Sequence, residues 1–73
     1  DAALEDESTR QALLDALKTL SERDQIVIAL YFFEGLTLGE IGQVLSVTES
    51  RVSQLRSRAT ASLRQGLAEA LSS

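Results

Sequence analysis

The sequence predicts an all-α fold, a four-helix domain that contains a helix-turn-helix. The 73 residues include no proline and only four glycines, and apolar residues recur at helical spacing along most of the chain. A chain of this length makes a single domain, residues 1–73, and buries only about 60% of the surface that its unfolded state exposes. We expect the helices to cover about residues 8–20, 22–34, 38–45 and 49–68.

The first helix follows an acidic stretch, residues 1–7, and either Asp6 or Ser8 can cap it. Four leucines at helical spacing form its apolar stripe, with two alanines beside them. The leucines are Leu13, Leu14, Leu17 and Leu20, and the alanines are Ala12 and Ala16. The second helix should begin after Ser21, which can act as an N-cap, and end before Gly35, where a C′ glycine is expected.

The second helix is apolar nearly all round. It could be a central helix that is buried on every side, or it could present one side to a partner protein, because a small domain cannot easily bury a whole helix. The sequence leaves both hypotheses open. Its core-face residues are Ile26, Val27, Ile28, Ala29, Leu30, Phe32 and Phe33. The candidates for a partner-binding side are Ile28, Tyr31 and Phe32.

The chain is organised around residues 37–55, which predict two short helices joined by a tight turn. Thr37 and Glu40 form a capping box that begins the third helix at Leu38. The apolar stripe of this helix consists of Ile41, Val44 and Leu45.

The turn that follows has its own signals. Gly42, inside the third helix, suits a place where another backbone crosses close by, because glycine otherwise costs about 1 kcal/mol there. Val47 can fill the wedge between the helices, and Thr48 can cap the next one. Together these features predict a helix-turn-helix.

The fourth helix should bury one stripe and expose a polar face. The stripe consists of Val52, Leu55, Ala59, Leu63 and Leu67, and Gly66 should fray or bend the end of the helix. The polar face of the first two turns carries Glu49, Ser50, Arg51, Ser53, Gln54 and Arg56. Serine, glutamine and arginine suit base edges and phosphates. They are also ordinary surface residues, and most such helix pairs bind no nucleic acid.

Charge is unevenly placed along the chain. Residues 1–48 hold nine acids and three bases, net −6, whereas residues 49–73 hold two acids and four bases, net +2, which together give the −4 of the whole chain. The basic charge therefore lies on the predicted recognition helix. Because phosphate neutralisation supplies much of the affinity for DNA, we expect weak binding in isolation and a need for tethering to a larger machine.

The composition excludes several classes of function. Without cysteine or histidine, the chain lacks disulfides, thiolate metal sites and the commonest general base, so we expect no enzyme, no catalytic residue, no metal and no cofactor. No apolar run reaches the roughly 18 residues of a membrane span, so no membrane partner is expected. The chain does not start with methionine, and we expect it to be a piece of something longer.

The run LTLGEIGQVLSVTESRVSQLRSRATASLR, residues 36–64, resembles region 4, the C-terminal domain of bacterial sigma-70-family sigma factors. The stretches VTESRVSQL and LSERDQIVIALYFFEGLTLGEIG are most similar to the flagellar and sporulation (FliA/WhiG-like) branch. The resemblance covers about residues 10 to 65. It implies a cytoplasmic, nucleoid-associated alternative sigma factor domain that binds the −35 promoter element, docks on the β flap of RNA polymerase core and is captured by an anti-sigma factor.

The resemblance also implies which residues contact DNA. Arg51 and Gln54 are the best candidates for hydrogen bonds to bases or phosphates, and Arg56 and Arg58 for contacts to the DNA backbone. The whole predicted set is Thr37, Leu38, Glu49, Ser50, Arg51, Ser53, Gln54, Arg56 and Arg58.

Three positions depart from the family pattern. Ser46 stands where many members have glycine, so a left-handed turn there would be mildly strained. Arg56 stands where this branch often has histidine, and Ser50 replaces an acid of the housekeeping members, so base preference cannot be transferred from that type.

Two alternatives remain at this point. One is the DNA-binding domain of a LuxR-type response regulator, although the chain lacks that group's usual lysine and histidine pattern after the turn. The other is a helical domain that serves only protein interaction, with the second helix as its docking surface.

Overall fold

The computed structural model describes residues 7–72, and all regular structure in that range is helical. The elements are α2 (Glu7–Lys18), α3 (Glu22–Ile28), the π-helical turn η1 (Ala29–Phe33), α4 (Leu38–Leu45) and α5 (Glu49–Ser72). The predicted all-α fold with a helix-turn-helix is confirmed. No helix in the described range is both long enough and apolar enough to cross a membrane.

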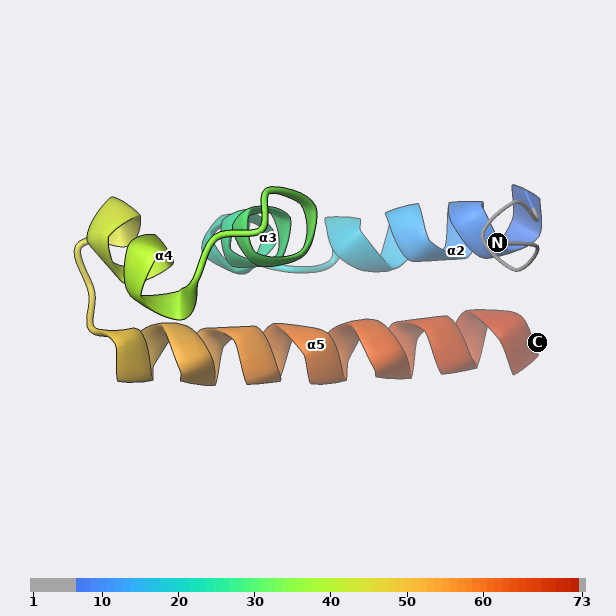
Figure 1. Ribbon diagram of the computed structural model, residues 1–73. Coiled ribbons are helices and arrows are strands. Elements are labelled where there is room, and N and C mark those ends of the chain that lie inside the picture. The colour runs from blue at the N-terminus through green and yellow to red at the C-terminus, as the bar shows by residue number, and fades with distance from the viewer. Residues whose placement is uncertain (1–6, 73) are drawn as a thin grey trace.

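The long helix α5 forms one side of the molecule, and the other helices lie in a second layer along it. Figure 1 shows α4 beside the beginning of α5 and α2 beside its C-terminal half, with α3 seen nearly end-on between them. Two apolar clusters join the layers. One consists of Val27, Ile41, Val52 and Leu55, and the other of Leu20, Ile28 and Ala59. Because α5 contributes to both clusters, it is the helix on which the other elements are assembled.

Helix α2 packs through its alanines, not through the whole leucine stripe. Ala12 and Ala16 are buried, whereas Leu14 is 44% exposed, so the predicted inward position of Leu14 is wrong. The reason lies in α5, where a Cβ built on Gly66 would come within 3.3 Å of the Ala16 Cβ. Such a close approach of two helices leaves room only for small side chains.

The ends of α2 and α5 also differ from the prediction. The α2 helix stops at Lys18, and residues 19 and 20 form a turn in which the Thr19 amide donates to the Ala16 carbonyl at 3.1 Å. Helix α5 does not fray or bend at Gly66 but continues to Ser72, since the glycine lies against α2. Asp6, one predicted cap of the first helix, lies outside the described residues.

The second predicted helix is divided in two. Its start is as expected, because the Asp24 amide donates to the Ser21 hydroxyl at 3.2 Å. From Ala29 the hydrogen bonds lengthen to the i+5 pattern, with the Glu34 amide donating to the Ala29 carbonyl at 3.1 Å. Gly35 then ends the segment with a φ of +73°, as predicted.

The wider turn rotates the side chains that follow it relative to a continuous α-helix. Phe33 is 70% exposed and Phe32 56% exposed. The predicted core position of Phe33 is wrong, whereas Phe32 was also a candidate for the partner-binding side. Ile28 is only 3% exposed and packs with Leu20 and Ala59. The prediction that Ile28 faces a partner is wrong, because this side chain belongs to the core.

Candidate nucleic-acid interface

The first helix of the motif begins at a complete capping box. The Glu40 amide donates to the Thr37 hydroxyl at 3.1 Å, and the Thr37 amide donates to the Glu40 carboxylate at 2.8 Å. The box holds the start of α4 rigidly, as predicted. Within residues 7–72, the Leu38 and Gly39 amides have no hydrogen-bond partner, as expected of the first turn of a helix, and they point along its axis.

The turn between α4 and α5 folds back over Gly42. The Gly42 carbonyl accepts from the Ser46 amide and also from the Val47 amide, the latter at 2.9 Å. A Cβ on Gly42 would lie 2.7 Å from the Val47 carbonyl oxygen, so only glycine fits without movement. Ser46 takes the left-handed conformation at φ 59° and ψ 43°, the strained geometry that its place in the turn predicted.

The two helices of the motif meet through a small buried face. Ile41 and Val52 are 0% exposed and Leu55 is 1% exposed, with Leu45 packed against them. Val44 is 60% exposed, so its predicted place in the apolar stripe is wrong. Since each helical residue turns by about 100°, Gly42 and Val44 lie at equal angles, about 80°, on opposite sides of the direction shared by Ile41 and Leu45. The turn covers the Gly42 side and leaves the Val44 side open.

The opposite side of α5 is polar at its N-terminal end. Thr48 caps the helix, because its hydroxyl accepts from the Arg51 amide at 3.1 Å. Ser50, Arg51 and Gln54 are exposed, and the Arg51 guanidinium donates to the Gln54 side chain at 3.4 Å. Within residues 7–72, Arg51 forms no ion pair with Glu40 or Glu49, so this cation remains available to a ligand.

Glu49 and Ser53 complete this face. The Glu49 carboxylate reaches back over α4, since its Oε1 lies 3.4 Å from the position of a Cβ on Gly39. Ser53 is half-buried. The structure thus brings Glu49, Ser50, Arg51, Ser53 and Gln54 together beside the Thr37 and Leu38 end of α4. These are seven of the nine residues predicted to contact DNA.

The other two predicted residues leave this face on different sides. The Arg58 guanidinium donates to both carboxylate oxygens of the buried Asp24, at 2.9 and 3.2 Å. Arg56 donates to the Tyr31 hydroxyl at 2.9 Å, and its guanidinium carbon lies 4.9 Å from the centre of the tyrosine ring. Both arginines therefore already have partners within the chain. Nothing local in the sequence signals these pairs, whose members stand 25 and 34 residues apart.

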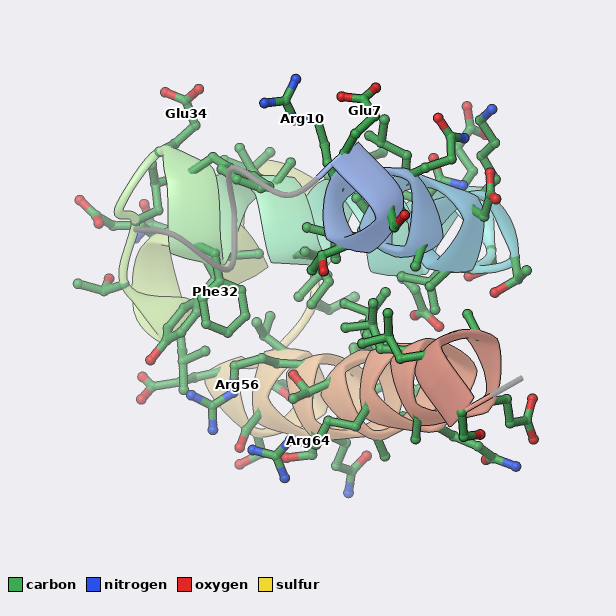
Figure 2. All side chains as sticks on the ribbon, turned by 90° about the vertical axis from the view of Figure 1, so that its right-hand side faces the viewer. Glu7, Arg10, Phe32, Glu34, Arg56 and Arg64 are labelled. Carbon is green, nitrogen blue, oxygen red and sulfur yellow. The ribbon has the colours of Figure 1, made fainter. Side chains whose placement is uncertain are left out.

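A groove opens between η1 and α5 on the side of Arg56. Its volume is about 420 Å³, and it is lined by Tyr31, Phe32, Arg56, Ser57, Thr60, Ala61 and Arg64. The Tyr31 and Phe32 rings meet edge to face, with centroids 4.9 Å apart. Figure 2 shows Phe32 pointing from η1 towards α5, where Arg56 and Arg64 project, whereas Glu7, Arg10 and Glu34 point away. Tyr31 and Phe32, which were predicted to bind a partner, thus line the groove, whereas Arg64 was not predicted to belong to any site.

Comparison with known proteins decides the family. Residues 16–65 match the family described as Sigma-70, region 4. The chain belongs to this family. This match favours the sigma-factor interpretation over a LuxR-type domain and over a domain that serves only protein interaction.

Relatives place this region-4 domain in the FliA branch. It is 55% identical to RNA polymerase sigma factor FliA of Pseudomonas aeruginosa over 64 residues. These residues make up 88% of this chain and 26% of that protein. It is 52% identical over 62 residues to FliA of Escherichia coli K12, 85% of this chain and 26% of that protein. RNA polymerase sigma-D factor of Bacillus subtilis is 46% identical over 52 residues, which make up 71% of this chain and 20% of that protein. The chain spans about a quarter of the length of the curated relatives it matches.

Proposed function

We propose that this domain recognises the −35 element of promoters for an alternative sigma factor, by placing the first turns of α5 in the major groove. The division of α5 into two faces carries the proposal. Val52 and Leu55 are buried, so the exposed Ser50, Arg51 and Gln54 form the face that a groove can receive. In helix-turn-helix proteins the N-terminal residues of the second helix contact base edges.

The start of α4 supports the same orientation. The unpaired Leu38 and Gly39 amides, together with the helix dipole, favour a DNA phosphate at this end. A phosphate contact there would fix the register of α5 on the duplex without carrying sequence information.

We further propose that the domain is held at promoters by RNA polymerase core, through its β flap, and that an anti-sigma factor can capture it. The net charge of −4 predicts weak, salt-sensitive binding of the isolated domain to DNA. A tether would raise the effective concentration. Tyr31 and Phe32 are the proposed protein-docking residues, because the Phe32 ring is more than half exposed. This function belongs in the cytoplasm, at the nucleoid.

Arg51→Ala tests the proposed DNA interface. Binding isotherms on a −35 duplex and its single-base variants distinguish the roles of this side chain. If Arg51 contacts a base edge, the variant loses about 1–3 kcal/mol and relaxes preference at one base pair. If it contacts a phosphate, the loss is similar on all sequences and the salt slope falls by about one.

Arg10→Ala is the matched control, because it removes the same charge from a side chain that points away from α5 in Figure 2. It should change affinity only slightly and equally for all duplexes. Equal binding of the unaltered chain to every −35 variant would remove sequence recognition from the proposal, and an unchanged Arg51→Ala variant would remove Arg51 from the interface.

A further inference from the structure

We infer that the groove between η1 and α5 binds an acidic segment of a partner protein that carries a large apolar side chain. This deepens the protein-docking part of the proposed function by naming the chemistry of the partner. The groove combines an exposed aromatic ring, Phe32, with two arginines, Arg56 and Arg64, and none of its lining residues within 7–72 carries a carboxylate.

The aromatic side of the groove accounts for the apolar part of the partner. Phe32 is 56% exposed, and the edge-to-face contact with Tyr31 fixes its ring. Ala61, across the groove on α5, adds no bulk. A leucine or phenylalanine side chain can therefore lie on Phe32 over Ala61, and burial of such an anchor is a usual source of affinity at protein interfaces.

The basic side of the groove accounts for the acidic part. Arg56 and Arg64 both line it, eight positions apart, which is about 12 Å along a helix. The Tyr31 ring and hydroxyl hold the Arg56 guanidinium in place, and a guanidinium has further donors for a carboxylate. The groove is thus locally positive in a chain of net charge −4, so a partner that carries acids is favoured by charge complementarity.

The position of the groove favours protein over DNA. Arg56 is turned by about 120° around the α5 axis from Ser50, at the centre of the proposed DNA face. The apolar ring of Phe32 has nothing to gain from a phosphate backbone. An acidic protein segment satisfies both the ring and the arginines, whereas DNA would satisfy only the arginines.

A pair of synthetic peptides tests the inference on the 73-residue chain. The first is a helical peptide with two glutamates about 12 Å apart and a leucine between them. The control peptide has glutamine in place of both glutamates. Fluorescence anisotropy of the labelled peptides gives the affinities, and amide chemical shifts of the isotope-labelled chain give the location. The glutamate peptide should bind at least about fivefold more tightly than the glutamine peptide, with shifts centred on Phe32 and Thr60.

Two variants of the chain assign the affinity to the groove. Phe32→Ala should weaken the glutamate peptide about tenfold, and Arg64→Gln about threefold. Arg10→Gln, on the far side of the molecule, should leave the affinity unchanged. Circular dichroism should show native helicity in all three, because the replaced side chains are exposed.

Three results of the peptide measurements would contradict the inference. Absence of binding, equal affinity for the two peptides, or shifts that lie away from the groove would overturn the inference. If Phe32→Ala and Arg64→Gln instead weakened a −35 duplex on every sequence and left the peptide unaffected, the groove would belong to DNA. The peptide measurement uses no promoter, so a failure of −35 recognition and a failure of this inference give different results.

Discussion

The helix-turn-helix and the α3–η1 segment are neighbours of similar apolar content, but they use that content differently. In the motif, residues close in the sequence cap, turn and bury one another: Thr37 with Glu40, and Gly42 with Val47. In α3–η1, Ile28 is buried whereas Phe33 is 70% exposed, and the hydrogen bonds change to the π pattern between them. Short-range rules thus fix where helices begin and end. The direction in which an all-apolar helix buries its side chains depends instead on the elements packed against it.

The largest effect should come from placing the same charge on the two sides of α3–η1. Ile28→Asp would bury a carboxylate next to Leu20 and Ala59, so we expect a loss above about 4 kcal/mol, which exceeds what a small domain can bear. Phe32→Asp replaces a side chain that is 56% exposed and should cost only the contact with the Tyr31 ring, about 0.5–1.5 kcal/mol. Circular dichroism and urea unfolding measure both.

The two variants also separate core from docking surface. Ile28→Asp should have lost its helicity, whereas Phe32→Asp should remain folded and fail to bind the acidic peptide. A folded Ile28→Asp variant would contradict the burial of this residue and would restore it to the partner-binding surface.

The parts of the fold that the sequence predicted are those set by neighbouring residues. The caps at Ser21, Thr37 and Thr48 need only a hydroxyl and an amide three residues later. Gly35 and Ser46 mark left-handed positions that end helices. The π turn has no comparable signature, since its i+5 bonds can form over ordinary apolar residues. The place of the π turn and the exposure of Phe33 were therefore not predicted, although Phe32 was already a candidate for a partner-binding side.

The candidate site likewise has a part that helical spacing predicts and a part that depends on contacts distant in the sequence. The face formed by Ser50, Arg51 and Gln54 follows from helical geometry once Val52 and Leu55 point inward. The partners of Arg56 and Arg58 come from α3 and η1, far away in the sequence. Helical spacing alone could not show that Tyr31 and Asp24 would meet them, because that depends on how the two layers cross.

A smaller effect should separate two glycines of α4. Gly42→Ala places a Cβ 2.7 Å from the Val47 carbonyl oxygen, and the clash should outweigh the better helix propensity, for a net loss of about 1–2 kcal/mol. Gly39→Ala places its Cβ 3.4 Å from the flexible end of Glu49, and should gain up to about 1 kcal/mol. Urea midpoints give the difference.

The two alanine variants should therefore change stability in opposite directions. Both substitutions improve helix propensity equally, so any difference between them measures how closely the turn approaches α4. If Gly42→Ala were as stable as Gly39→Ala, the turn could move away at little cost, and the motif would be less rigid than its hydrogen bonds at Gly42 indicate.

The smallest effect concerns the strain at Ser46. A left-handed residue with a Cβ costs roughly 1–2 kcal/mol, and Ser46→Gly would relieve this at φ 59°. Glycine also gains entropy in the unfolded chain, roughly 0.5–1 kcal/mol, so we expect a net stabilisation of only about 0.5 kcal/mol. Ser46→Asn should give a similar gain, because asparagine tolerates this region and keeps the unfolded chain stiffer. Ser46→Ala is the control that removes the hydroxyl but retains the strain, and it should give no gain.

The three substitutions also test whether the strain serves recognition. Ser46 already holds the conformation that glycine favours, so relieving the strain should leave α4 and α5 where they are and the −35 isotherms unchanged. A loss of base preference in Ser46→Gly, with normal preference in Ser46→Asn, would mean that a stiff turn is needed to hold α5 in register on DNA. Equal preference in all three would assign the register to the capping box and to the packing of Ile41 against Val52. In that case the turn would join two helices that their buried face already aligns.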